Sequence, residues 1–289
     1  MLKLNIQMKP IAFAITYFLA LFFLQAQSFS TQVLNKGQFL SAASLTQDYD
    51  GDGDLDIIAT RWSPTGVYLL ENDETKQFNA TAIIEDDLNF YMSDIDAADF
   101  DNDGDIDYLV SFTGVDDGEL AWFQRLDDGT YVKWTIATNK DFIMADVGDF
   151  NGDGRVDIVA VGLVNSDQRG RLYINQGNLF FTEQIIATNR IWGSVDAADV
   201  DNDGDLDIAF GGSASALGNP GEGARLILND GTGNFTESIF LHCWSDNHND
   251  CGGAQNIQIV DSRTMAVAKV ICNPNYPKLY RTINSCSGS

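Results

Sequence analysis

Four short segments of this sequence carry acidic side chains at a spacing suited to binding a metal ion. They span residues 48–56, 99–107, 149–157 and 199–207, and each alternates Asp or Asn with Gly. Side chains at positions 1, 3, 5 and 9 offer oxygen atoms, position 7 offers its backbone carbonyl, and Gly at position 6 permits a sharp turn. The predicted ligand residues are Asp48, Asp50, Asp52, Asp54, Asp56, Asp99, Asp101, Asp103, Asp105, Asp107, Asp149, Asn151, Asp153, Arg155, Asp157, Asp199, Asp201, Asp203, Asp205 and Asp207.

Hard oxygen donors in this number favour Ca²⁺, since Mg²⁺ requires a smaller and stricter octahedron. The alternative, an Asp/Gly turn without metal, leaves several carboxylates repelling one another on nine residues. An EF-hand is excluded because its position 12 would need Glu, whereas these segments have Ala59, Val110, Ala160 and Phe210 there. We therefore expect about four structural calcium sites. The third should be weaker, because it has Asn151 at position 3 and offers only the carbonyl of Arg155.

The four cation loops recur at intervals of 51, 50 and 50 residues. Short β-branched or apolar runs flank each loop, and two further runs follow it, separated by Gly-, Asn- or Asp-rich turns. Four short strands in a repeat of this length are typical of one β-propeller blade, and sustained helical periodicity is absent from the sequence. The sequence predicts an all-β propeller.

Five blades are the leading count, with a truncated seven-bladed propeller as the rival. A degenerate fifth blade is predicted over residues 257–282, with strands at 257–260, 265–268 and 278–281 and no cation loop. Its missing outer strand would come from residues 29–34, which would close the ring and hide exposed strand edges.

The repeated nonapeptide resembles the integrin-alpha N-terminal propeller and the bacterial FG-GAP/VCBS-type repeats. The resemblance covers about residues 29–240, with a degenerate continuation to about 282, and the nearest match to the Phe-Gly-Gly half of the pattern is 209–212. It implies Ca²⁺ at the matched aspartates, holding the first two strands of each blade together. Family propellers commonly have seven blades. The resemblance implies much less about ligands, because one fold hosts unrelated functions.

The N-terminus is typical of an exported protein. Residues 1–26 combine Lys3 and Lys9 with an apolar run and a cleavage site at Ala26, so they are predicted to be a signal peptide preceding one domain at 27–289. We expect a secreted or cell-surface protein with no membrane span after cleavage. The net charge of −25 argues against nucleic acid or anionic lipid as a partner.

Four cysteines lie near the C-terminus: Cys243, Cys251, Cys272 and Cys286. An even count in an exported chain predicts two disulfides, and loop length favours Cys243–Cys251 and Cys272–Cys286 among the three pairings. The link between the fourth and fifth repeats also contains the only histidines, His242 and His248, without a zinc pattern. No catalytic residues are predicted, since phosphate-binding and nucleophile-elbow motifs are also absent.

The face opposite the cation loops carries the longer and more variable loops. Candidate ligand-binding residues there are Tyr91, Phe142, Trp192 and Trp244, with Met92 at the position equivalent to Phe142. Aromatic rings of this kind stack on sugars, and the alternative, which we favour, is packing between blades. The preferred function is an extracellular binding or adhesion module for a glycan or protein partner. The alternatives are a polysaccharide lyase or hydrolase on the same scaffold, and a scaffold fragment of a longer surface protein.

Overall fold

The structure is a computed structural model. It describes residues 42–62, 64–72, 78–85, 91–114, 118–162, 169–188, 192–212, 224–241, 254–259 and 268–272, all within the compact unit Gln38–Ser289. Several predictions lie outside the described residues: the signal peptide, the closing strand at 29–34, the strand at 278–281, His242, His248, Trp244, Cys243, Cys251 and Cys286.

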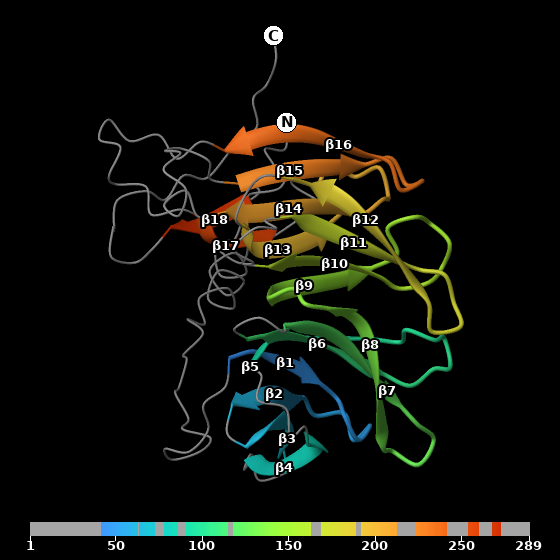
Figure 1. Cartoon of the computed structure of the whole chain (residues 1–289). Helices are drawn as coiled ribbons and strands as arrows, with labels where there is room; N and C mark the ends of the chain where they lie inside the picture. The colour runs from blue at the N-terminus through green and yellow to red at the C-terminus, as the bar shows by residue number, and fades with distance from the viewer. Residues whose placement is uncertain are drawn as a thin grey trace, which may run out of the picture. The chain divides into compact units, whose positions relative to one another are not determined.

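The described part of the chain contains eighteen strands and no helix; sixteen of the strands form four sheets of four, and the other two form a pair (Figure 1). Blade 1 contains β1 (Ser44–Gln47), β2 (Asp56–Trp62), β3 (Thr65–Asn72) and β4 (Phe78–Glu85). Blade 2 contains β5 (Tyr91–Ala98), β6 (Asp107–Thr113), β7 (Glu119–Arg125) and β8 (Tyr131–Thr138). Blade 3 contains β9 (Phe142–Gly148), β10 (Asp157–Gly162), β11 (Gly170–Asn175) and β12 (Phe181–Ala187). Blade 4 contains β13 (Trp192–Ala198), β14 (Asp207–Gly212), β15 (Ala224–Asn229) and β16 (Phe235–Leu241).

Within each blade the strands pair antiparallel in chain order, so the predicted four-stranded repeat is confirmed. The second strand is buried on both faces: all six residues of β10 are buried, and so are six of the seven in β6. This explains its continuous apolar sequence. The fourth strand is far more exposed, and β8 has no buried residue, which explains its polar content.

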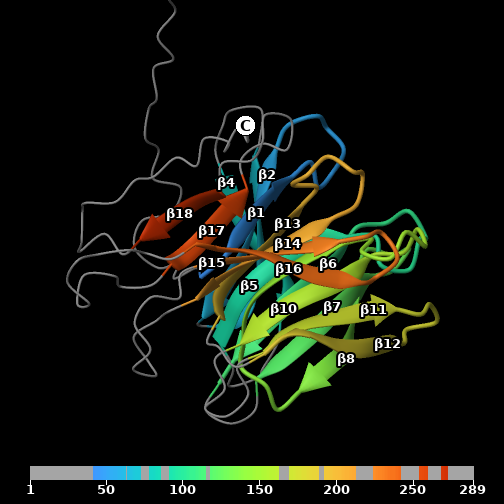
Figure 2. The same ribbon diagram turned by 90° about the horizontal axis from the view of Figure 1, so that it is seen from above.

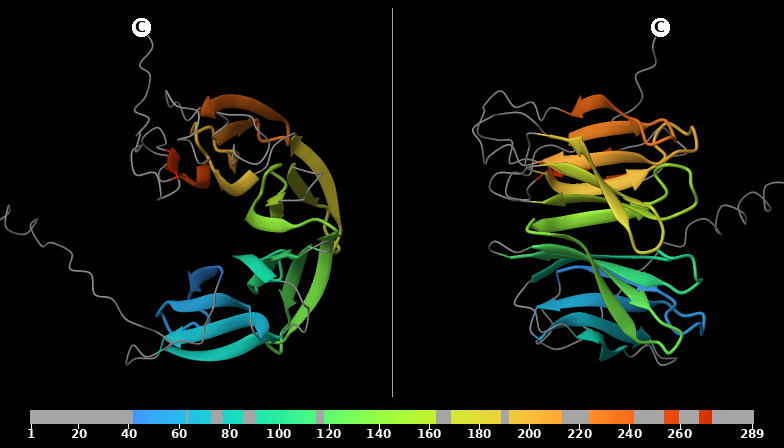
Figure 3. Two further views of the ribbon diagram at one scale, coloured as in Figure 1. Left: turned by 60° about the vertical axis from the view of Figure 1, so that its left-hand side comes forward. Right: turned by 45° about the vertical axis from the view of Figure 1, so that its right-hand side comes forward.

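The blades pack against one another in chain order through their first strands, with β1 next to β5, β5 next to β9, β9 next to β13 and β13 next to β17 (Figure 3). Three apolar clusters fill the spaces between neighbouring sheets. One joins blades 1 and 2, another blades 2 and 3, and the last blades 3 and 4. The core therefore lies between the sheets, and each blade is stabilised mainly by its neighbours.

The fifth repeat forms a strand pair, β17 (Ala254–Ile259) and β18 (Ala268–Cys272), beside β13 (Figure 2). The second strand was predicted at 265–268; Ala268 begins β18, and residues 265–267 lie outside the described part of the chain. No helix in the described residues is long and apolar enough to cross a membrane.

Candidate functional site

The four cation loops share one backbone conformation, which the sequence specifies through two positions. Position 4 has a positive φ in every loop, at 78° in Gly51, 60° in Asn102, 73° in Gly152 and 63° in Asn202. Gly and Asn are the residues that tolerate this region best. At position 6 the glycine N–H donates to the carboxylate at position 1, over 2.7–3.1 Å. The loop folds around its first aspartate.

The aspartate at position 9 ties each cation loop to the third strand of its blade. Asp56, Asp107, Asp157 and Asp207 are at most 2% exposed. One carboxylate oxygen accepts the N–H of position 2, and the other accepts the N–H of the last residue of the third strand, over 2.7–3.2 Å. Sequence reasoning assigned these residues to metal binding alone. The structure adds a second role, as acceptors that hold three segments of the blade together.

In three of the loops, carboxylate oxygens converge. Groups whose ligand atoms all lie within 4.8 Å of one another are Asp48, Asp50 and Asp56; Asp99, Asp101 and Asp107; and Asp199, Asp201 and Asp203. In the fourth loop, Oδ1 of Asp199 is buried and has no hydrogen-bond partner among the described residues. An orphaned carboxylate oxygen inside an acidic cluster fits a hard divalent cation such as Ca²⁺.

Electrostatics within these loops point the same way. Desolvation, followed by repulsion from Asp103, raises the pKa of Asp101, and desolvation, followed by repulsion from Asp203 and Asp199, raises that of Asp205. Desolvation raises the pKa of Asp107 to about 6. These carboxylates are held in an environment that disfavours their charge, and a bound cation would relieve it.

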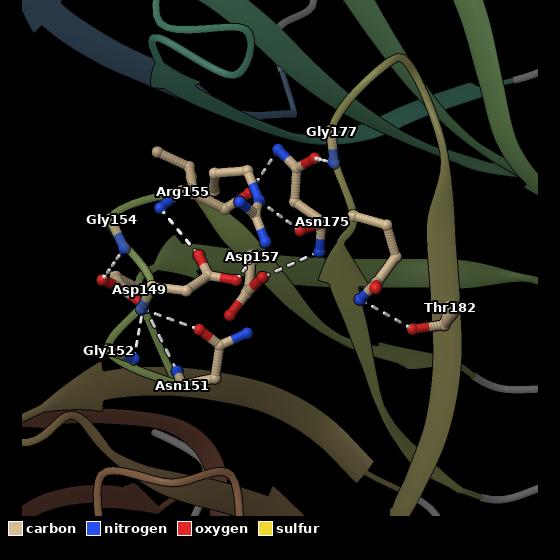
Figure 4. Close-up of polar contacts among 12 residues, drawn as sticks. Asp149, Asn151, Gly152, Gly154, Arg155, Asp157, Asn175, Gly177 and Thr182 are labelled. Carbon is tan, nitrogen blue, oxygen red and sulfur yellow. Dashed lines mark hydrogen bonds and ion pairs between the residues drawn. The ribbon is translucent and has the colours of Figure 1, made fainter.

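The loop of blade 3 differs from the others. No three-carboxylate cluster of the kind found in the other loops occurs among its residues, all of which the structure describes. Instead, the guanidinium of Arg155 pairs with the carboxylate of Asp153, and its Nε donates to the carbonyl of Asn175 at 2.7 Å (Figure 4). Of the predicted ligands in this loop, Asp153 therefore contacts the guanidinium, and Asn151 offers an amide oxygen at position 3 where the other loops have a carboxylate.

Two asparagines at the ends of third strands connect consecutive blades, and sequence reasoning missed them. Asn175 Nδ2 donates to the carbonyl of Phe100, at position 2 of the blade 2 loop, at 2.9 Å. Asn229 Nδ2 donates to the carbonyl of Phe150, at the same position of the blade 3 loop, at 2.8 Å. We call Asn175 and Asn229 the interblade asparagines. The available signal was their recurrence just before the turn to the fourth strand.

The candidate aromatic residues have different environments. Phe142 and Met92 are completely buried, and Phe142 packs on Tyr173 with ring centroids 6.2 Å apart. Phe142 is thus a core residue with no surface for a ligand, as expected if these positions pack between blades. Tyr91 is 53% exposed and forms an edge contact with Trp62, which is 43% exposed, at a centroid distance of 5.4 Å. Trp192 begins β13, and its side chain is outside what the structure describes.

Comparison with known proteins supports the repeat assignment. The profile of the FG-GAP-like repeat matches residues 48–110 and 149–210, and each match contains two cation loops. No curated protein matches the chain. Among solved structures, the crystal structure of the V. cholerae biofilm matrix protein Bap1 has 18% sequence identity and a TM-score of 0.34, over 72% of this chain and 41% of that one. The chain thus spans about two fifths of that protein, and a likeness this distant assigns it neither fold nor function.

Both profile matches begin at the first aspartate of a cation loop, at residues 48 and 149, and end in the second strand of the following blade. Each match therefore covers a cation loop, the last three strands of its blade, and the first strand and cation loop of the next blade. Residues 48–110 and 149–210 of this chain are similar to FG-GAP-like repeats.

Proposed function

We propose that this protein is a calcium-stabilised extracellular binding module that presents an exposed aromatic pair, Trp62 and Tyr91, to a neutral glycan. The exposure of these two rings together is the observation that carries the binding part of the proposal. The carboxylate clusters in the loops of blades 1, 2 and 4 support the calcium part.

Calcium would act on stability and not on chemistry. In each of the three clusters the position 1 aspartate also holds the loop backbone, so a cation there would fix the link between the first two strands. Extracellular calcium modules bind with Kd of ~10⁻⁴–10⁻³ M. Free Ca²⁺ at about ten times such a Kd adds ~1.4 kcal/mol per site. Three sites would contribute about 4 kcal/mol, a large fraction of the typical net stability of a domain.

The aromatic pair is placed for contact with a ligand. Trp62 ends β2 and Tyr91 begins β5, so both lie at the strand ends opposite the cation loops of blades 1 and 2. The indole of Trp62 donates to the carbonyl of Met92 at 3.3 Å, which fixes the ring at the boundary between the two blades. Rings held in this way offer apolar faces to the C–H surface of a sugar at little entropic cost.

Net charge favours a neutral glycan over an acidic one. The chain carries 42 acidic and 17 basic residues, for a net charge of −25. Three bound Ca²⁺ would leave it strongly negative, so an anionic polysaccharide or a nucleic acid would be repelled. The predicted signal peptide and the even cysteine count support an extracellular location, where calcium is abundant and disulfides persist.

The test measures retention of the mature protein on immobilised neutral polysaccharides in calcium, together with any oligosaccharide released. Tyr91→Ala should weaken retention about tenfold, the equivalent of ~1.4 kcal/mol of stacking. The matched control is Phe180→Ala, which removes a ring that is 59% exposed in the turn before β12, on the cation-loop side. The control should bind as the wild type does.

Each other outcome has a defined meaning. If Tyr91→Ala and Phe180→Ala are both retained as well as the wild type, the aromatic pair does not bind the glycan. Release of oligosaccharide would show an enzyme in place of a binding module. Failure of every polysaccharide to retain the protein would reject the glycan and direct the search to a protein partner.

A further inference from the structure

Four aspartates lie on the first strands of blades 2, 3 and 4, outside the cation loops. Asp96 in β5, Asp146 in β9 and Asp196 in β13 occupy the same position in the repeat, three residues before the loop. Asp94 lies two residues earlier in β5. Because β5 packs against β9 and β9 against β13, these side chains lie on strands that are neighbours in space (Figure 3). We call the four residues the aspartate row.

Two members of the aspartate row bridge neighbouring blades. An oxygen of Asp94 accepts the N–H of Ala145 in blade 3 at 2.9 Å. An oxygen of Asp146 accepts the N–H of Ala197 in blade 4 at 2.6 Å. The first strands of different blades belong to different sheets, so no backbone ladder joins them. The contacts between blades therefore include two carboxylates as well as the apolar clusters.

The charges that surround the aspartate row are its own. The four first strands and β17 contain no basic residue, and their only acids are the members of the row. The other charged residues on strands that pack closely against β5, β9 or β13 are Arg61, Glu71, Asp56, Asp107, Asp157 and Asp207. The four aspartates among them are hydrogen-bonded within their own blades, Glu71 is exposed, and the guanidinium of Arg61 lies over the ring of Tyr68 at 5.1 Å.

Burial and mutual repulsion disfavour ionisation of the row. Desolvation raises the pKa of Asp94 and that of Asp146 from the ordinary 3.8 to about 6, although each carboxylate accepts backbone hydrogen bonds that lower it. Desolvation, followed by repulsion from the other three members, raises the pKa of Asp96 well above its ordinary value. Carboxylates that interact in this way release their protons in steps. Asp94 and Asp146 therefore change from mostly neutral near pH 5 to mostly charged near pH 7.

We propose that the aspartate row binds protons and thereby couples the contacts among blades 2, 3 and 4 to pH, so that these blades are held together more tightly in mildly acidic surroundings. A protonated carboxyl group keeps its carbonyl oxygen as an acceptor for the N–H of Ala145 or Ala197, so protonation removes the charge and not the hydrogen bond. Ionisation places like charges on neighbouring strands, and separation of the blades lets water reach them.

The direction of the effect follows from proton binding. Between pH 3.8 and about 6 the native state holds protons that the unfolded state has released, so stability is greatest below this range and falls as the pH rises through it. Blade 1 has Leu45 at the equivalent position, so its structure should respond less. The inference does not depend on the binding of calcium or of a glycan, because it concerns neither the cation loops nor the aromatic pair.

Hydrogen exchange of the full mature wild-type chain at pH 5 and pH 7 tests the proposal. Excess Ca²⁺ at both pH values holds the occupancy of any calcium site constant, and each rate is divided by the intrinsic rate of a free amide at that pH. Protection of the Ala145 and Ala197 amides should fall about tenfold from pH 5 to pH 7. The control in the same sample is the amide of Thr60, which donates to the carbonyl of Ala43 in blade 1 at 3.0 Å and should change less than about twofold. An equal fall at all three amides, or no fall at Ala145 and Ala197, would overturn the inference.

The variant Asp146→Asn assigns the effect to one member of the row. It keeps an acceptor for Ala197 but cannot ionise, so the protection of Ala197 should become nearly independent of pH. Ala145, which is bonded to Asp94, should keep most of its response. Asp127→Asn is the matched control, since it makes the same substitution in the exposed turn before β8 and should leave both responses unchanged. A full tenfold response of Ala197 in Asp146→Asn would show that another group controls this contact and would reject the row as the proton-binding element.

Discussion

Replacing Asn175 with alanine tests whether the interblade asparagines hold neighbouring blades together. The side chain of Asn175 is 2% exposed and makes three hydrogen bonds. It donates to the carbonyls of Phe100 at 2.9 Å and Val156 at 3.1 Å, and accepts the N–H of Gly177 at 2.9 Å. Alanine leaves all three partners unsatisfied.

The expected cost follows from these contacts. A hydrogen bond of this kind contributes about 1 kcal/mol net, so Asn175→Ala should lower the free energy of unfolding by about 3 kcal/mol. Asn72→Ala is the matched control, because Asn72 ends the third strand of blade 1 and its side chain donates to its own loop, at Leu55 O and 3.3 Å. Its Oδ1 has no hydrogen-bond partner among the described residues. The control should cost about 1 kcal/mol or less.

Urea unfolding followed by circular dichroism measures both variants. With a urea dependence of about 3 kcal/mol per M, the midpoint for Asn175→Ala should fall by about 1 M. Hydrogen exchange should also speed up around Phe100, in the neighbouring blade. Equal destabilisation by Asn72→Ala and Asn175→Ala would refute the reasoning, because the bond to Phe100 would then add nothing.

Two further predictions concern calcium and pH. Trp134 donates to Gln124 at 2.9 Å, and Gln124 donates to Asp101 in the loop of blade 2 at 2.5 Å, so chelation should change tryptophan fluorescence. A change of undiminished size in Trp134→Phe would exclude this route. Burial raises the pKa of Asp94 to about 6, above its ordinary 3.8, so its ionisation destabilises the fold as the pH rises through this window. Asp94→Asn keeps an acceptor for the N–H of Ala145. In chelator its melting temperature should exceed that of the wild type at pH 7 and equal it near pH 4. A difference in melting temperature that stays constant between pH 4 and pH 7 would contradict this.

The blade architecture was predictable because each blade is specified locally. The cation loop fixes the end of one strand and the start of the next within nine residues, and the 50-residue period repeats that information four times. Turn glycines and alternating fourth strands supplied the rest. The fifth repeat has no such loop between β17 and β18, so its sequence offers no equivalent marker for the ends of its strands.

The contacts between blades were much harder to predict. Asn175 and Phe100 are 75 residues apart in sequence, and Asn229 and Phe150 are 79 apart. Their recurrence before the turn to the fourth strand is visible in the sequence, but it does not show that they contact the preceding blade. The burial of Phe142 depends in the same way on the apolar cluster between blades 2 and 3, to which the neighbouring blade contributes Leu109, Leu120 and Trp122. A pattern of residue types predicts which strand a side chain belongs to. It does not predict as readily which residues of a neighbouring segment will cover that side chain.

Calcium bound in these loops, as proposed, would act through the same contacts on more than the blade that holds it. The interblade asparagines bond to position 2 of the preceding blade's loop, and in blade 2 the guanidinium of Arg125 lies 5.0 Å from the ring of Tyr49, at position 2 of the loop of blade 1. Position 2 also donates its N–H to the buried aspartate at position 9. A cation that orders a loop therefore orders the surface on which the next blade rests. Because each blade contacts mainly its neighbours, stability in such a chain depends on its interfaces, and the loops control three of them.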